Sequence, residues 1–433
     1  MLEVMIILGI ESSCDETAAA VVEDGYRLLS NVVASSMDLH AVYGGVVPEI
    51  AARSHIEAIT GVIEQALEQA ECTWDDIDAI AVTYGAGLGG SLLIGVLTAR
   101  TLAITHNKPL YACNHVEGHV YANFLTEVKK IRALSDYKLP PTQPTFPLLA
   151  LIVSGGHSQL VLFQDHFDYV LLGQTQDDAI GEAYDKVAKI LGLPYPGGPS
   201  VGKKALEGDP HAFTFPKARM TSVSPALESL RGESSKTANP VARALSASSA
   251  GDRRWGSAGQ NERSDVLPEE GRAPLDQSVL QMGATPHAHF KPPLSYDFSF
   301  SGLKTAVLRT AQELIGEDHT FPSKNLPERL LEPQKADIAA SFQRVATETV
   351  VDKALQAYEE FQPASVVIAG GVAASPELRR QLAERLPCPV AYTDPRLCTD
   401  NGAMIATLGC FHMKYGRQTA DPYSLDIRPN LSM

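Results

Sequence analysis

Three segments of the chain share one pattern, in which a short apolar run ends in a tight turn and a second apolar run or a helix follows. They are MIILGIESSCDETAAAVVED (5–24), LLALIVSGGHSQLVLF (148–163) and SVVIAGGVAASPELRRQL (365–382). The first two predict strand–turn–strand hairpins, and the third predicts a strand that ends at Gly370-Gly371 and enters a helix. A hairpin that recurs in this way indicates two related lobes, which limits the possible folds more than any other feature of the sequence.

Helical patterns lie between these segments, at 54–71, 91–106, 178–191, 334–360 and 401–412. Strands that alternate with helices predict α/β layers. A chain of 433 residues with 44% hydrophobic and 20% charged residues has room for two domains with separate cores. No apolar run approaches the ~20 residues that cross a bilayer, so we expect no membrane segment. The first residues lack the basic region of a signal peptide.

The cysteine and charge content narrow the class of protein further. The six cysteines form no CxxC pair and no regular spacing, which suits a reducing cytoplasm better than a disulfide framework. A net charge of -15 argues against a broadly basic nucleic-acid binder. An RNA substrate would therefore have to meet a local basic patch or a partner subunit.

Two histidines lie four residues apart in HVEGHVYANF (115–124). On a helix, His115 and His119 share one face, a spacing that suits two imidazoles on one metal. The zinc-protease motif is H-E-x-x-H, but here the acid is Glu117. At ~100° per residue it projects about 200° away from His115. This order of residues speaks against a metallopeptidase.

A third metal ligand is needed, because a bare pair of histidines is as well explained by two unrelated polar residues. Asp400 in RLCTDNGAMIA is the candidate, and its alternative role is a simple helix N-cap. Two histidines and one carboxylate leave open positions for substrate on zinc or ferrous iron.

Glycine-rich turns indicate a nucleotide site. SGGH (154–157), AGG (369–371) and GAGLGGS (85–91) let the backbone approach a ligand and offer N–H groups to phosphate oxygens. No Walker A sequence is present, and no Rossmann fingerprint stands in its strand-to-helix setting, so the nucleotide fold is of another type. Asp185, ahead of a proline–glycine turn, is either a surface residue or a ligand for ribose hydroxyls.

The turn ESSCDET (11–17) is acidic instead, with Glu11, Asp15 and Glu16. Acids in such a loop repel bare phosphate, so they position a metal or a water, or accept a proton.

Eight blocks of the sequence, taken together, resemble the bacterial tRNA N6-adenosine threonylcarbamoyltransferase (TsaD) family, whose relatives were once described as glycoproteases. In chain order they are GIESSCDETAAAVV, GAGLGGSLLIGVLTAR, NHVEGHVYANF, LIVSGGHSQLV, GEAYDKVAKILGLPYPGGP, FSFSGLKTAV, VVIAGGVAAS and CTDNGAMIA. They span nearly the whole chain, apart from a proline-rich stretch at 126–147 and a stretch at 217–290 that is rich in Ser, Ala, Gly, Pro and Arg. We expect the first stretch to be a linker or surface excursion and the second to be a disordered insertion.

The resemblance implies an actin-like ATPase fold, of the sugar kinase and heat-shock protein type, with two lobes around a central ligand cleft. The expected division is an N-terminal lobe at 1–125, a second lobe at 148–216 and 291–400, and a C-terminal segment at 401–433 that returns to the N-terminal lobe.

The resemblance also implies a function. The threonylcarbamoyl group would pass from threonylcarbamoyl-AMP to N6 of adenosine 37, in tRNAs that read codons beginning with A. TsaB-like and TsaE-like proteins are the implied partners. His115, His119 and Asp400 carry over as ligands of one divalent metal, with iron the usual assignment and zinc the alternative. The residues that carry over as donor contacts are Ile152, Val153, Ser154, Gly155, Gly156, Asp185 and Gly198.

Asp15 is the candidate acceptor of the amine proton. The chain departs from the family pattern at Ser375, where many members have Asn, and at Gly202, where some carry an acid. Both departures concern adenylate binding. The competing functions are an actin-fold ATPase or small-molecule kinase, a non-catalytic nucleotide-binding scaffold, and the disfavoured metallopeptidase.

Overall fold

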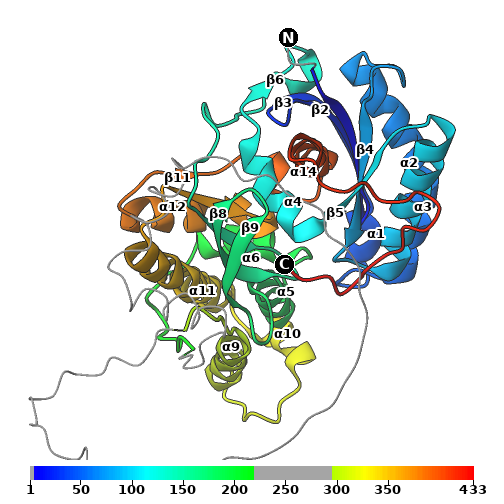
Figure 1. Cartoon of the computed structure of the whole chain (residues 1–433). Coiled ribbons are helices and arrows are strands. Elements are labelled where there is room, and N and C mark those ends of the chain that lie inside the picture. Colours follow the sequence, from blue (N-terminus) through cyan, green and yellow to red (C-terminus); the bar gives the residue numbers. More distant parts are fainter. Residues whose placement is uncertain (1–3, 219–294) are drawn as a thin grey trace, which may run out of the picture.

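The computed structural model describes residues 4–218 and 295–433, which form two lobes, each built on one mixed sheet (Figure 1). The stretch at 217–290 predicted to be a disordered insertion lies outside the described residues, except for its first two positions. Within the described ranges, no helix is both long and apolar enough to span a membrane.

The two sheets repeat one strand order. In the first sheet the strands lie in the order β5-β4-β1-β2-β3-β6, and in the second β11-β10-β7-β8-β9. Each sheet has three antiparallel strands in sequence, and the two following strands run parallel to the first of them. The strands are β1 (Ile6–Glu11), β2 (Glu16–Glu23), β3 (Arg27–Ser35), β4 (Ala79–Gly85), β5 (Leu110–Asn114), β6 (Glu127–Val128), β7 (Leu148–Val153), β8 (Ser158–Asp165), β9 (Asp168–Gln174), β10 (Ser365–Ala369) and β11 (Val390–Ala391).

Helices close the faces of both sheets. On the first lobe, α2 and α3 cover one face and α4 and α14 lie on the other (Figure 1). The helices of this lobe are α1 (Met37–Ala41), α2 (Pro48–Ala70), α3 (Gly89–Thr105), α4 (His115–Tyr121) and α14 (Gly402–Lys414). Those of the second lobe are α5 (Ile180–Leu191), α6 (Gly197–Ala205), α9 (Ser301–Leu314), α10 (Leu326–Arg329), α11 (Glu332–Phe361), α12 (Pro376–Arg385) and α13 (Pro395–Cys398). Short 3₁₀ turns lie at Ala122–Phe124, Arg132–Leu134, Ser323–Asn325 and Gly371–Ala374.

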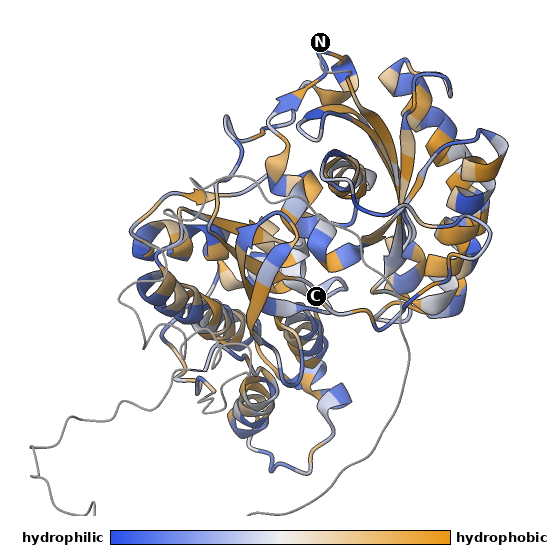
Figure 2. Ribbon diagram, in the orientation of Figure 1, coloured by the Kyte–Doolittle hydropathy of each residue, from blue (hydrophilic) through white to orange (hydrophobic). Residues whose placement is uncertain are grey.

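The apolar core joins the two lobes through α14. One cluster lies under α2 and α3, a second lies under the helices of the second lobe, and a third lies between the two sheets around α14. Figure 2 shows the apolar residues concentrated on the strands and on the helix faces that meet them. A Cβ at Gly9 on β1 would lie 2.3 Å from the backbone nitrogen of Ala406, so glycine lets α14 pack directly on β1.

Two regions differ from the sequence predictions. Helix α2 begins at Pro48 and not at residue 54, because proline suits the first helical position, where no backbone donor is needed. Strand β6 and the buried Leu134 lie in the stretch expected to be a linker. Part of that stretch therefore adds to the first sheet and its core.

Candidate active site

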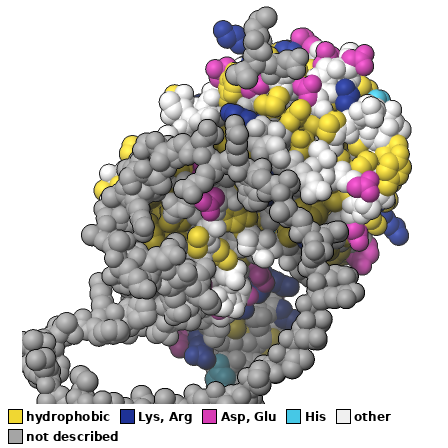
Figure 3. Space-filling view, in the orientation of Figure 1, with side chains coloured by type: hydrophobic (Ala, Val, Ile, Leu, Met, Phe, Trp, Pro, Cys, Tyr) yellow, Lys and Arg dark blue, Asp and Glu magenta, His cyan; other side chains and the backbone are white. Residues whose placement is uncertain are grey.

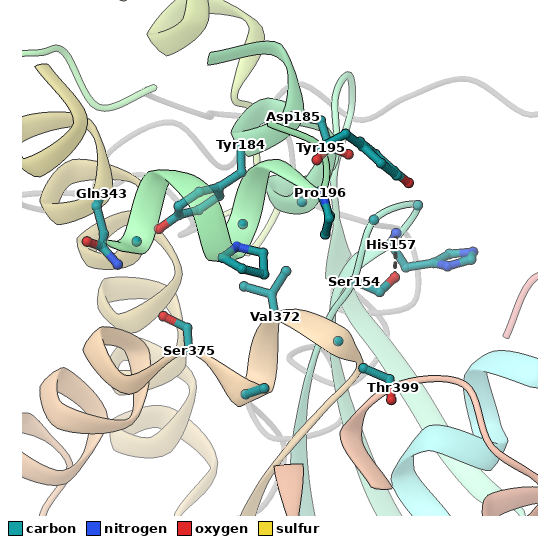
Figure 4. A pocket seen from close by; sticks show the side chains of 18 of the residues that line it. Ser154, His157, Tyr184, Asp185, Tyr195, Pro196, Gln343, Val372, Ser375 and Thr399 are labelled. Atoms are coloured by element: carbon teal, nitrogen blue, oxygen red, sulfur yellow. Dashed lines mark hydrogen bonds between the residues drawn. The ribbon is translucent and has the colours of Figure 1, made fainter. Parts of the chain in front are cut away.

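A cavity of about 1160 Å³ opens between the lobes. The first lobe lines it with the turn that joins β1 to β2 and with the start of α4, and the second lobe with the turn after β7, helices α5 and α6, and the segment that follows β10. Figure 4 shows that Ser154, His157, Asp185, Tyr195 and Ser375 come from these different elements of the second lobe.

His115, His119 and Asp400 come together at the edge of the cavity, which His115 and Asp400 line. The Oδ1 atom of Asp400 lies 3.5 Å from Nε2 of His115 and 3.2 Å from Nε2 of His119. One atom from each of the three residues lies within 4.8 Å of the others. The predicted triad is therefore assembled in space, although its members come from two distant parts of the chain.

Helix capping explains why these three side chains are available. The side chain of Asn114 caps α4 by accepting from the backbone N–H groups of Val116 at 2.8 Å and Glu117 at 3.4 Å. At α14, the cap is the neighbouring Asn401, which accepts from the N–H of Met404. Asp400 is thus not the N-cap, and its carboxylate is left to face the two histidines.

The triad fits a divalent metal ion. Two atoms bound to one ion at about 2.1 Å are separated by about 3.0–3.5 Å, which is the spacing found around Oδ1 of Asp400. Nε2 of His119 is close to Asp400, yet it lacks hydrogen-bond geometry and is buried without a hydrogen-bond partner. A buried polar atom without a partner is unfavourable, and an ion held between these atoms satisfies it.

Glu11, at the end of β1, contacts the His115 ring on the side away from Asp400. It is fully buried, and its Oε2 lies 3.3 Å from Nδ1 of His115. Burial disfavours a charged His115, but the charges of Asp400 and Glu11 outweigh it and raise the pKa of this histidine to about 9. A carboxylate on the second ring nitrogen orients a ligating histidine. This role of Glu11 was not predicted, because the sequence pattern showed only an acid within a turn.

Glu117 lies on another side of α4, as the helical angle predicts. It does not belong to the metal-ligand cluster of the described residues, and its charge interacts with Arg417. Burial raises its pKa to about 7, and its Oε1 has no hydrogen-bond partner. The acid of the HVEGH stretch is therefore not placed as the base of a zinc protease.

The acidic turn on the first lobe reaches the same cavity through Cys14, Asp15 and Glu16. Burial, reinforced by the charges of Asp400 and Asp15, raises the pKa of Glu16 to about 10. Glu16 is thus uncharged at neutral pH, which removes one negative charge from a crowded group of acids.

The glycine turn on the second lobe has the opposite character. Gly155 and Gly156 are exposed, a Cβ at either position would meet nothing within 4 Å, and neither has a positive φ. The fold itself does not require glycine there, so the glycines leave room for a ligand next to the backbone N–H groups. Ile152 and Val153 are fully buried in β7 and do not line the cavity.

The part of the cavity wall formed by α5, α6 and the start of α12 carries the remaining residues predicted to contact the threonylcarbamoyl donor. They are Asp185, Gly198 and Ser375. The carboxylate of Asp185 accepts from the N–H of Gly197 at 2.6 Å, and burial raises the pKa of Asp185. Ser375 also lies at the N-cap of α12, where its Oγ accepts from the N–H of Leu378 at 3.4 Å.

Tyr195 and Gln343 are among the further side chains that line this wall and were not predicted (Figure 4). Gln343 lies near Gly202, since a Cβ at that glycine would be 3.6 Å from Nε2 of Gln343. Tyr195 precedes the predicted proline–glycine turn, and proximity to that motif was the available signal. Gln343 carries no such signal, because it lies inside a long helix.

Two sheets of the same strand order, with a ligand cavity between them, define an actin-like ATPase fold. The model of the family described as "TsaD: tRNA N6-adenosine threonylcarbamoyltransferase" matches residues 27–252 and 261–407. The chain belongs to this family. It is therefore a transferase that forms threonylcarbamoyladenosine in tRNA.

Curated relatives match over nearly their full length and bear the name tRNA N6-adenosine threonylcarbamoyltransferase. The protein from Thermomicrobium roseum is 42% identical, over 99% of this chain and 97% of its own. The protein from Desulfitobacterium hafniense is 40% identical, over 99% of this chain and 97% of its own. The protein from Symbiobacterium thermophilum is 42% identical, over 95% of this chain and 92% of its own.

Proposed function

We propose that the chain transfers the threonylcarbamoyl group from threonylcarbamoyl-AMP to N6 of adenosine 37, in cytoplasmic tRNAs that read codons beginning with A. The observation that carries this proposal is the pairing of two different sites on one cavity. A cation triad lies on one side, and a glycine turn with free space around it lies on the other. The donor is a mixed carbamic–phosphoric anhydride, so it has both a carbonyl to be activated and a phosphate to be held.

In this proposal His115, His119 and Asp400 hold one divalent metal, Fe²⁺, with Zn²⁺ as the alternative. Bound there, such an ion draws charge from the donor's oxygens as the adenylate leaves. Glu11 and Ser13 keep the His115 ring oriented toward Asp400, because their Oε2 and Oγ atoms lie 3.3 and 3.1 Å from the other ring nitrogen.

The second lobe would hold the adenylate part of the donor. The N–H groups of Gly155 and Gly156 receive the phosphate, in line with the open space around both residues. Asp185 and Gly198 receive the ribose, and Ser375 contributes to the adenine end of the wall. The two metal-ligating histidines and the adenylate contacts then come from opposite lobes, which fixes the carbonyl carbon between them.

Asp15 would accept the proton that the exocyclic amine loses as the new C–N bond forms. Its side chain is 8% exposed and belongs to the cavity wall. An amine conjugated with a purine is a weak nucleophile, so removal of its proton during attack lowers the barrier.

Protein partners would supply positive charge for binding tRNA, because this chain has a net charge of -15. Large hydrophobic side chains are exposed on two adjacent helices, Ile56 on α2 and Leu93 and Leu97 on α3. Hydrophobic side chains reach the surface at the right-hand edge of Figure 3, where α2 and α3 lie in Figure 1. We assign this surface to the TsaB-like partner. A TsaE-like protein is the second partner that the family resemblance implies.

Mass analysis of nucleosides tests the proposal directly. The purified protein with its partners, threonylcarbamoyl-AMP and unmodified tRNA should produce threonylcarbamoyladenosine at position 37. Unchanged levels of this nucleoside in cells depleted of the protein would contradict the proposal. ATP hydrolysis or phosphorylation of a small molecule, without tRNA modification, would favour the actin-fold ATPase or kinase.

A further inference from the structure

A buried histidine on α2 contacts the turn that carries Asp15. His55 is fully buried, and both of its ring nitrogens have partners. Nε2 lies 3.0 Å from the carbonyl oxygen of Cys14, and Nδ1 lies 2.8 Å from Oγ1 of Thr17. His55 does not line the cavity and does not belong to the metal triad. Its polar contacts therefore serve the backbone around Asp15.

The carbonyl groups of residues 13–15 are all held by donors from elsewhere in the first lobe. The distances are between 2.7 and 3.0 Å. The donors are the N–H of Leu88 to Ser13, Oγ of Ser91 and Nε2 of His55 to Cys14, and the N–H and Oγ of Ser36 to Asp15. Cys14 thus receives two side-chain donors, one from α2 and one from α3, and we call His55 and Ser91 the Cys14 clamp.

The protonation of His55 follows from its partners. A carbonyl oxygen only accepts, so Nε2 carries the hydrogen. Burial has the largest effect on the pKa of His55 and lowers it, so the ring is neutral and Nδ1 accepts from the hydroxyl of Thr17. A ring with this one tautomer cannot turn without leaving a buried nitrogen unpaired, so the clamp is rigid.

The clamp acts on the peptide that leads into Asp15. Because a peptide group is planar, fixing the carbonyl of Cys14 also fixes the nitrogen of Asp15. The direction in which the Asp15 side chain enters the cavity then depends on this plane. Catalytic groups lose effectiveness when they move by even about 1 Å.

We propose that His55 is a positioning residue of the transfer reaction, which holds Asp15 in its productive orientation through the carbonyl of Cys14. Ser91 forms the second half of the clamp. The inference rests on the proposed role of Asp15 as proton acceptor.

The test compares His55→Leu with His55→Gln in the full-length protein with its partners. Leucine fills the space but has no donor, whereas the glutamine amide can donate to Cys14 and accept from Thr17. We expect His55→Leu to lower kcat by about ten-fold or more, with KM for threonylcarbamoyl-AMP and metal content unchanged. His55→Gln should recover most of the lost kcat. The matched control is His166→Leu, which removes a histidine whose Nδ1 lies 3.1 Å from the hydroxyl of Tyr121, and it should leave kcat unchanged.

Three outcomes would overturn the inference: wild-type kcat in a folded His55→Leu protein, equal losses in the leucine and glutamine variants, or loss of metal in His55→Leu. If His55→Leu does not fold, Ser91→Ala carries the test, because it removes the other donor to the same carbonyl; an unchanged kcat there overturns the clamp. Asp15→Asn is measured in parallel. Full activity in that variant would refute the proposed role of Asp15, whereas an inactive Asp15→Asn beside a fully active His55→Leu would refute only the clamp.

Discussion

The turn between β1 and β2 and the turn between β7 and β8 occupy equivalent places in the two lobes, yet they are built in opposite ways. The first is acidic and mostly buried, and its backbone carbonyls are held by helices α2 and α3 and their neighbours. The second has two exposed glycines and is closed mainly by contacts between Ser154 and His157.

In the proposed reaction, the two similar sheets carry turns with two different chemical roles. Carboxylates and fixed carbonyls in the first turn suit cations and protons, whereas free N–H groups and open space in the second suit an anion. Because a reaction on an acyl phosphate needs both, the two turns must face each other across one cleft, and both line the same cavity. The predictions below test this division of roles between the lobes.

The largest expected effect is on the cation side, from His119→Ala. Two remaining ligands hold a divalent ion poorly, so metal content and transfer activity should both fall to background. Metal analysis of the purified variant, beside its transfer rate on unmodified tRNA, measures both. Full metal occupancy in this variant would break the assignment of the first lobe to cation chemistry.

Glu117→Gln is the matched control on the same helix. Its side chain lies outside the triad, and its buried carboxyl has an unpaired oxygen, so the amide should be tolerated. We expect metal content to be unchanged and activity to stay within a few-fold of the wild type, since none of the three ligands is altered. An inactive variant that still folds and binds metal would favour the hypothesis that HVEGH belongs to a metallopeptidase, with Glu117 as its base.

Asp15→Asn should have the next largest effect. Asparagine keeps the size of the side chain but cannot accept the amine proton, so the rate should fall by roughly 10²–10⁴-fold. Metal content and donor binding should be unchanged. The control is Asp38→Asn, the same chemical change at an exposed residue of α1. A comparable loss in that control would show that the turn needs only negative charge nearby.

The sequence predicted the frame of the molecule better than the fine structure of its two turns. Both hairpins, the strand–helix unit after Ser365 and the pairing of His115 with His119 were predicted, because strand periodicity and the spacing of the two histidines are local signals. Asp400 was added to the pair as a candidate third ligand, and the family resemblance implied the same role. The contacts of Glu11 and His55 were not predicted, since each depends on a partner far along the chain, 104 residues away for Glu11 and 41 for His55. The inclusion of Ile152 and Val153 in the donor loop came from family resemblance, and both side chains are fully buried in β7.

A smaller effect is expected on the anion side, from Gly156→Ala. The structure leaves space for a Cβ at this position and imposes no left-handed backbone, so the protein should fold normally. If the N–H groups of the turn hold the donor phosphate, the methyl group interferes with its approach, and KM for the donor should rise about ten-fold. Steady-state kinetics with metal analysis separates this effect from a metal defect. The control is Gly302→Ala, at another position with open space at the start of α9, and it should leave KM unchanged. A normal KM in Gly156→Ala would contradict the assignment of the donor phosphate to this turn.

The smallest effect concerns the far end of the anion side, at Ser375, a position where the family resemblance predicts asparagine. The segment that starts at Gly370 packs against the glycine turn, since a Cβ there would lie 2.5 Å from the carbonyl oxygen of Val153. Ser375→Asn should keep the helix cap, because asparagine caps helices as well as serine does. Its longer amide adds a donor that reaches further into the cavity, so donor binding should be equal or tighter by up to ~1 kcal/mol, the net worth of one hydrogen bond. Calorimetric titration with a non-hydrolysable donor analogue measures this. Weaker binding would mean that the entrance of α12 is arranged differently from this proposal and has no room for the longer side chain beside the donor.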